Sequence, residues 1–168
     1  MINVWNPQAL NIRRMTLQDV ERVLHVERRS FTAPWSRQAF MTELIDNQFA
    51  RYIVAEYDGN IIGYAGVWLI MDEGHVTNIA VDPDFRGRHL GEQLLKSLMS
   101  ICLAQGGTRM TLEVRVSNYV AQTLYTKLGF ESVGVRKGYY TDNNEDALIM
   151  WADLPPLPEL EHHGGSPV

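Results

Sequence analysis

Arginines and glycines mark the point where an apolar strand ends and an amphipathic helix begins, in the stretch from Ile79 to Glu92. Backbone N–H groups at a helix N-terminus have no partner within the helix, and together with the helix dipole they favour a bound phosphate. Arg86 and Arg88 add positive charge, and Gly87 and Gly91 let the backbone approach a ligand closely. The stretch predicts a phosphate or pyrophosphate site; the alternative is a surface loop with solvated arginines.

Two side chains farther along the chain are of types that transfer protons. Apolar and polar residues alternate from Met110 to Val116, so a strand here turns Glu113 away from the apolar face. This places Glu113 either in a cleft or simply in solvent. On the following predicted helix, Tyr125 either reaches the same cleft or packs in the core, and Asn118 stands where a helix cap is expected.

Two helices and an antiparallel meander are predicted to precede these residues. The segment Thr16 to Asp19 resembles a capping box and starts a helix through about Phe31, and Ser36 fits the N-cap of a second helix through about Ile45. Strands are predicted over residues 12–15, 51–57, 61–71 and 75–81. The sequence Asp58-Gly59-Asn60 between two of them is typical of a hairpin turn.

Helices and strands alternate in the second half of the chain. A helix is predicted from Gly91 to near Gly106, followed by a strand over 109–116, a helix over 118–128, and strands over 133–140 and 147–151. Strands separated by helices imply a right-handed crossover with some parallel pairing. The predicted fold class is therefore α/β, or α+β, with a mixed sheet.

Composition indicates one soluble domain and argues against several classes of protein. The chain has 168 residues, 45% of them hydrophobic and 21% charged, and its net charge of -5 argues against general nucleic-acid binding. We find neither a signal-like N-terminus nor an apolar run long enough to span a membrane, so we expect a cytoplasmic protein. The single cysteine, Cys102, lies on the apolar face of its helix and is expected in the core rather than as a nucleophile.

A change of composition near Leu154 predicts the end of the folded domain. We expect one domain over residues 1–153 and a Pro-rich, disordered tail over residues 154–168. The adjacent His162 and His163 fall in this tail, where solvation is expected rather than metal binding, so no metal is predicted.

Four segments, taken in order, resemble the GNAT family of N-acetyltransferases. They are the turn at 79–92, Leu-Glu-Val-Arg-Val-Ser-Asn at 112–118, Leu-Tyr-Thr-Lys-Leu-Gly-Phe at 124–130, and the segment from Tyr139-Tyr140 to Met150. The resemblance spans roughly Ile12 to Trp151 and is closest to the bacterial ribosomal-protein-alanine N-acetyltransferases of the RimI type, which are similar at 34–36 and 78–83. It implies a mostly antiparallel sheet of about seven strands, splayed in a V, with about four flanking helices.

The resemblance also implies a cosubstrate, acetyl-CoA, and roles for individual residues. The backbone of Ile79, Ala80 and Val81 would bind its acetyl and pantetheine portion, and Asn118 would touch it. The pyrophosphate would be bound by Gly87, Arg88, His89, Leu90, Gly91 and Glu92. Glu113 would act as general base and Tyr125 as general acid, in direct transfer to the N-terminal alanine of small ribosomal subunit protein eighteen.

One residue departs from the family pattern. Family members often have glycine where this chain has His89. Because histidine adopts most backbone conformations other than strongly left-handed ones, we expect the turn to form with its backbone donors intact. The departure bears on affinity for the cosubstrate rather than on the fold.

The acceptor is the part of the prediction that the sequence specifies least. Trp35, Glu73, His75 and Tyr140 are expected to line the peptide entrance, with Tyr139 a weaker candidate. The expected partner is a protein N-terminus, with no nucleic acid or membrane bound directly and a monomeric or weakly dimeric state. Two alternatives are transfer to a lysine side chain or small amine, and a CoA-binding module without turnover. A nucleotide-binding Rossmann domain is disfavoured, since the turn lacks Gly-x-Gly-x-x-Gly and follows a meander.

Overall fold

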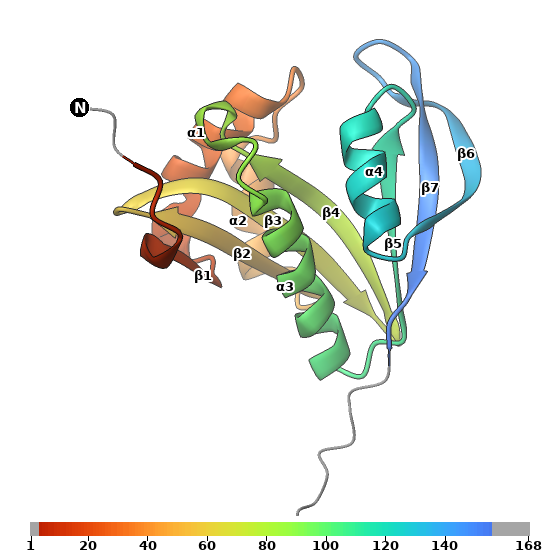
Figure 1. The fold of residues 1–168 in the computed structure, drawn as a ribbon, viewed down its shortest axis with the longest axis horizontal. Helices are drawn as coiled ribbons and strands as arrows, with labels where there is room; N and C mark the ends of the chain where they lie inside the picture. Colours follow the sequence, from red (N-terminus) through yellow and green to blue (C-terminus); the bar gives the residue numbers. More distant parts are fainter. Residues whose placement is uncertain (1–3, 156–168) are drawn as a thin grey trace, which may run out of the picture.

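The computed structural model describes residues 4–155, and within this range the elements expected from the sequence are present in the expected order (Figure 1). The strands are β1 (Leu10–Arg14), β2 (Ala50–Tyr57), β3 (Asn60–Ile70), β4 (Glu73–Val81), β5 (Arg109–Arg115), β6 (Glu131–Tyr140) and β7 (Glu145–Asp153). The helices are α1 (Val20–Ser30), α2 (Arg37–Ile45), α3 (Leu90–Ala104) and α4 (Tyr119–Lys127). Short 3-10 turns are η1 (Pro7–Ala9), η2 (Leu17–Asp19) and η3 (Pro83–Phe85).

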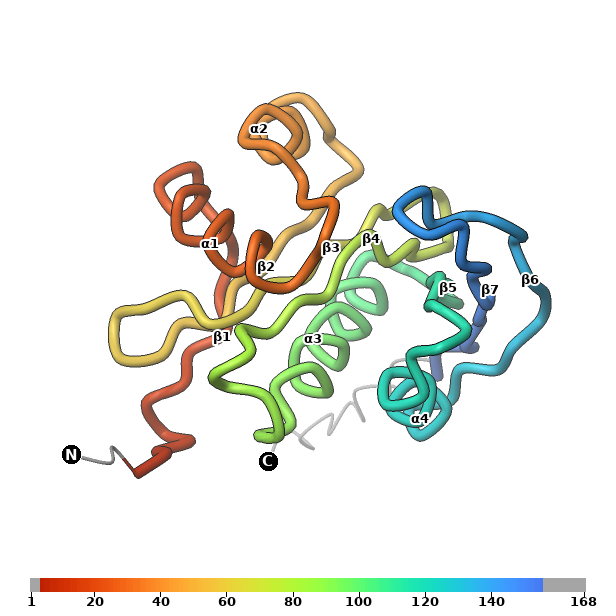
Figure 2. The backbone as a smooth tube through the Cα atoms, turned by 90° about the horizontal axis from the view of Figure 1, so that it is seen from above, coloured from red at the N-terminus to blue at the C-terminus, as the bar shows by residue number. Residues whose placement is uncertain are grey.

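The strands form one sheet in the order β1-β2-β3-β4-β5-β7-β6. Each neighbouring pair is antiparallel except β4 and β5, which are parallel. Figure 2 shows α1 and α2 on one face of the sheet and α3 on the opposite face, while α4 lies beside β5. The predicted fold class, a mixed and mostly antiparallel sheet of seven strands with four helices, is confirmed.

Strands β4 and β5 pair only at the base of a V. Their register joins Glu73 to Arg109, Gly74 to Met110 and His75 to Thr111, and the two strands then diverge (Figure 1). The sheet thus has a first arm, β1 to β4, and a second arm, β5 to β7. Along the opening, the facing edges of β4 and β5 have no neighbouring strand, so their backbone groups remain available to a ligand.

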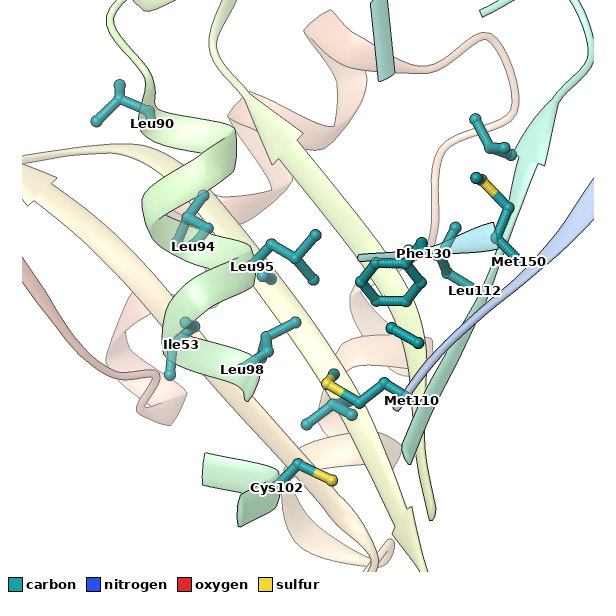
Figure 3. Close-up of a cluster of buried hydrophobic side chains, with 14 of the residues drawn as sticks. Ile53, Leu90, Leu94, Leu95, Leu98, Cys102, Met110, Leu112, Phe130 and Met150 are labelled. Carbon is teal, nitrogen blue, oxygen red and sulfur yellow. The ribbon is translucent and has the colours of Figure 1, made fainter. Parts of the chain in front are cut away.

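Hydrophobic cores on the two faces hold the arms in place. The larger core packs α3 against both arms, and in Figure 3 Leu95 and Leu98 point toward Phe130 and Met110. The smaller core packs α1 and α2 on the first arm. Cys102 is fully buried in the larger core, where burial raises the pKa of its thiol, as expected for a packing residue.

A bulge in β4 faces the opening of the V. Gly66 of β3 pairs with Asn78 and Val67 pairs with Val76, which leaves Thr77 as the extra residue. The Tyr52 ring fills the space over Gly66, and its hydroxyl lies 3.0 Å from Thr77 Oγ1. A side chain from β2, on the far side of β3, therefore fixes the bulge.

The bounds of the first helix and the end of the folded domain differ from the prediction. The segment from Thr16 forms the expected capping box but continues as the 3-10 turn η2, and α1 itself begins at Val20 and ends at Ser30. At the C-terminal end, Leu154 is buried in the larger core and donates its N–H to Thr108 O at 2.8 Å. The ordered structure thus extends past the predicted boundary at residue 153, and residues 156–168 of the predicted tail lie outside the described residues.

We predict that Gly66→Ala destabilises the protein by about 2 kcal/mol, because an added Cβ overlaps the Tyr52 ring in a packed core. Urea denaturation followed by circular dichroism measures the change. Gly134→Ala on β6 is the matched control, since its Cβ meets only Ile149 Cδ1, at 4.0 Å. Equal stabilities for the two variants would contradict the role given to Tyr52.

Candidate active site

A cleft of about 420 Å³ lies between the arms of the V. The first arm contributes the bulged part of β4, from Val76 to Ile79, and the second contributes β5, from Leu112 to Arg115. The end of α1 with the α1–α2 loop, the start of α4 and the β6–β7 hairpin complete its walls. The cleft is thus built from segments that are distant in the sequence, and the divergence of β4 from β5 brings them together.

Both residues predicted to transfer protons line this cleft. The Glu113 side chain is 24% exposed, and its Oε1 lies 3.9 Å from an Arg136 guanidinium nitrogen. Tyr125 reaches the cleft from α4 and packs on Phe130, with ring centroids 6.1 Å apart. Burial raises the pKa of Tyr125 to about 12, so its phenol remains protonated at neutral pH.

Three of the predicted contact residues also line the cleft. Asn118 caps α4 by accepting a hydrogen bond from Ala121 N at 3.1 Å, so its cap and cleft positions are compatible. Trp35 comes from the α1–α2 loop and Tyr140 from the end of β6. Tyr139, the weaker candidate, lines the cleft as well.

A hydrogen bond joins the two arms at the cleft. Thr32 Oγ1, in the α1–α2 loop, donates to Asp142 Oδ2, in the β6–β7 hairpin, at 2.7 Å. Arg115 pairs with Asp142 at 2.8 Å and with Glu145 at 3.2 Å, and its guanidinium lies 4.0 Å from the centroid of the Tyr140 ring. Loops from both arms are therefore held against each other beside Glu113.

The predicted anion site lies at the N-terminus of α3. The first intrahelical bond of the helix is from Gln93 N to His89 O, so the N–H groups before Gln93 have no acceptor within the helix. Gly87 has φ +81°, and no atom lies within 4 Å of the position that a Cβ would take. This backbone fits an anion that approaches closely.

The turn forms with a histidine where family members often have glycine. His89 adopts a left-handed conformation, φ 60° and ψ 22°, and serves as the N-cap of α3 without a side-chain cap. Its imidazole Nδ1 lies 3.6 Å from Glu92 Oε2 and is largely exposed. The turn requires a left-handed residue here, which explains why glycine suits this position better.

Charged side chains surround the α3 N-terminus. Arg86 Nε donates to Val81 O at 3.3 Å, while the Arg88 guanidinium lies 4.9 Å from the centroid of the Trp5 ring. Glu92 pairs with Lys127 at 3.0 Å, and this lysine together with Lys96 lowers the pKa of its carboxyl. The negative charge of Glu92 is thus compensated, and the site keeps cationic groups for an anion.

Two predicted substrate residues do not reach the cleft. Glu73 and His75 lie at the closed base of the V, on the part of β4 that pairs with β5. Glu73 pairs with Arg109 at 2.9 Å and with His75 at 3.0 Å, and the His75 ring packs edge-on against Trp151. Because the strands have not yet diverged at this level, these side chains stabilise the base instead of lining the opening.

Glu27 and Asn78 are among the cleft residues that the sequence did not single out. Glu27 is 1% exposed on the buried face of α1, four residues after Val23 and three after Leu24. A glutamate at such a position is a signal in itself, since buried carboxylates need hydrogen-bond partners. Asn78 left no comparable signal, because its role depends on the bulge in β4.

Within residues 4–155 there is no group of three His, Cys, Asp or Glu side chains arranged to hold a metal ion. Nor does any helix in this range have the length and apolarity needed to cross a membrane.

The fold and the cleft are those of an acetyltransferase class. The family model described as acetyltransferase (GNAT) family matches residues 20–130, and the chain belongs to this family of acetyl-transferring enzymes. A Bacillus subtilis (strain 168) protein is 48% identical over 143 residues, 85% of this chain and 95% of its own length. Its name provisionally assigns it ribosomal protein bS18-alanine N-acetyltransferase activity. The Escherichia coli (strain K12) protein of that name is 36% identical over 83% of this chain and 94% of its own length.

Solved structures agree with these sequence relationships. The crystal structure of the ribosomal-protein-S18-alanine N-acetyltransferase from Escherichia coli superposes with a TM-score of 0.81 and 32% identity, covering 90% of this chain and 97% of its own. PaiA N-acetyltransferase from Thermoplasma acidophilum, solved in complex with coenzyme A, has a TM-score of 0.72 at 20% identity, covering 86% of this chain and 98% of its own. The second likeness shows the fold alone.

Substitutions at His89 should separate backbone strain from side-chain chemistry. We expect His89→Val to cost about 1–2 kcal/mol of stability, because a β-branched residue tolerates the left-handed conformation poorly. His89→Gly should match or exceed the wild-type stability. Thermal and urea unfolding measure both variants, and a glycine variant less stable than the valine variant would refute the strain argument.

Proposed function

We propose that the protein transfers an acetyl group from acetyl-CoA to the α-amine of a protein N-terminus, with the N-terminal alanine of ribosomal protein bS18 as the acceptor. The observation that carries this proposal is that the open edge of β4 lines the cleft together with Glu113 and Tyr125, and that β4 leads through residues 82–89 to the N-terminus of α3. The names of the Escherichia coli and Bacillus subtilis relatives support the choice of acceptor.

The residues present fit acetyl-CoA, which supplies an activated thioester when bound. Backbone N–H groups over residues 87–92 suit its pyrophosphate, with positive charge nearby from Arg86 and Arg88. The backbone of Ile79, Ala80 and Val81 lies on the edge of β4 that has no strand neighbour, so it can pair with the amides of the pantetheine portion. Asn118 lies on the opposite wall, where the cosubstrate passes α4.

Glu113 is proposed as the general base. An α-amine has a pKa near 8 and is mostly protonated at neutral pH, so it must lose a proton before it can attack a carbonyl carbon. A carboxylate in the wall of the cleft takes this proton directly or through a water molecule. An Arg136 guanidinium nitrogen lies 3.9 Å from Glu113 Oε1, on the same wall of the cleft.

Tyr125 is proposed as the general acid. The departing thiolate needs a proton, and a phenol whose pKa is raised to about 12 still carries its proton throughout the neutral range. The backbone N–H groups of the open β4 edge suit the polarisation of the thioester carbonyl. Cys102 has no part in this direct transfer, since it is buried in the core.

Acceptor binding is proposed to involve Trp35, Tyr139 and Tyr140. These aromatic side chains line the cleft from both arms, and the hydrogen bond between Thr32 and Asp142 holds their loops together. We exclude Glu73 and His75 from the acceptor site because they pair with neighbours at the base of the V.

The proposal predicts that the purified protein releases CoA thiol when given acetyl-CoA and an alanine-initiated peptide of the bS18 N-terminus. Mass spectrometry should locate the acetyl group on the α-amine, and a peptide with a blocked N-terminus and an internal lysine should not react. Glu113→Gln should lower kcat about 100-fold or more, since it removes the base while keeping the side-chain shape. Acetylation of the lysine peptide alone would favour the alternative acceptor class.

A second prediction concerns Tyr125. Tyr125→Phe should lower kcat about 10- to 100-fold with little change in the KM for acetyl-CoA, because it removes only the proton donor. The wild-type rate should not decline between pH 8 and pH 10 through ionisation of Tyr125, since its pKa is raised to about 12. A wild-type alkaline limb near pH 9 that disappears in the phenylalanine variant would contradict this assignment.

A further inference from the structure

A chain of hydrogen bonds runs from α1 through β3 to the bulge of β4. Glu27 Oε1 accepts a hydrogen bond from Trp35 N at 3.0 Å, and Glu27 Oε2 accepts one from the Tyr64 hydroxyl. Tyr64 oxygen in turn lies 3.2 Å from the Asn78 side-chain amide. The chain connects the α1–α2 loop, which carries Trp35, to the strand that faces the cleft.

The direction of these hydrogen bonds follows from the number of protons available. Tyr64 has one hydroxyl proton, and it is donated to Glu27. The Asn78 group that faces the Tyr64 oxygen must therefore be a donor, which makes it Nδ2 and not the carbonyl oxygen. Glu27 thus sets the orientation of an amide to which it makes no direct contact.

This orientation leaves Asn78 Oδ1 on the other side of the amide. The atom is buried, and among residues 4–155 it has no hydrogen-bond partner. A buried carbonyl oxygen without a donor carries a desolvation cost that a bound N–H group would remove. Asn78 is one of the residues that line the cleft, so a ligand bound there lies beside this side chain.

The face of the sheet indicates which ligand this is. Tyr64 and Glu27 belong to the face covered by α1 and α2, and Asn78 is directed toward them, whereas α3 with its anion site covers the opposite face (Figure 2). A group that enters from the α1–α2 loop therefore meets Asn78 from the side away from the α3 N-terminus. The acceptor peptide is the proposed ligand of that side, and its first residues carry N–H donors.

We propose that Asn78 Oδ1 accepts a hydrogen bond from an N–H group at the amino end of the acceptor peptide, and that Glu27 and Tyr64 are positioning residues that orient it. This inference rests on the proposed function and adds an acceptor-binding residue to it. The same hydrogen bonds stabilise the fold, so the test needs a measurement that stability alone does not change.

Equilibrium binding of two probes supplies that measurement. One probe is CoA, and the other is a conjugate in which the CoA sulfur is joined through an acetyl linker to the α-amine of an alanine-initiated peptide. Asn78→Ala should weaken binding of the conjugate roughly 3- to 10-fold, the effect of one lost hydrogen bond, and leave CoA affinity within about twofold. Asn11→Ala, at an exposed position on the edge strand β1, is the matched control and should change neither affinity.

A double-mutant cycle tests the positioning role. Tyr64→Phe should weaken conjugate binding by a smaller factor than Asn78→Ala, because it frees the amide to rotate. In the Asn78→Ala background Tyr64→Phe should have no further effect on conjugate affinity, since Tyr64 acts through Asn78. If Asn78→Ala does not fold, Tyr64→Phe alone must still weaken the conjugate without weakening CoA.

Three results would overturn the inference. One is equal weakening of CoA and conjugate by Asn78→Ala, another is no weakening of either, and the third is additive losses in the double variant. If the wild type acetylates the peptide and one of these results is obtained, the inference fails while the proposed function stands. If the wild type neither acetylates the peptide nor binds the conjugate more tightly than CoA, the proposed function fails, and the inference fails with it.

Discussion

The short parallel pairing of β4 with β5 is the constraint on which the site depends. Three residue pairs at the base join the arms, and above them both strands have backbone edges without a strand neighbour. An exposed strand edge invites pairing with another chain, which most proteins prevent. Here α3 packs against both arms in the larger core, and the cleft occupies part of the opening between them. The divergence of β4 from β5 therefore leaves backbone groups without sheet hydrogen bonds, and the same groups form an edge that a ligand can pair with.

The two faces of the sheet carry different parts of the site. The α3 face carries the proposed anion site and the larger core, and the α1–α2 face carries the buried Glu27 with its partners. Glu113 and Tyr125 both line the opening between the arms, so they stand where ligands bound from the two faces would meet. This arrangement suits direct transfer between two bound molecules, with no covalent intermediate on the enzyme.

Local strain and buried polar groups are concentrated around the site. His89 is left-handed at the start of α3, Thr77 is the extra residue of the bulge, and Asn78 keeps a carbonyl oxygen without a partner. Each of these features costs stability by itself and persists because its neighbours fix it. Tyr52 fixes the bulge from β2, and Tyr64 fixes Asn78 from β3. The first arm is thus a rigid support for one wall of the cleft.

The sequence by itself determined the elements, the turn that begins α3 and the alternation that directs Glu113 away from the apolar face, because these depend on neighbours a few residues apart. The family resemblance supplied the V-shaped sheet and the proposed roles of Glu113 and Tyr125. Only the tertiary structure decided that Glu73 and His75 lie below the opening. Their position depends on how many residues of β4 pair with β5, and this is set by packing between segments that are about 35 residues apart in the sequence. It also decided the left-handed conformation of His89, the burial of Leu154 and the orientation of Asn78. Each of these results from long-range contacts that local periodicity does not encode.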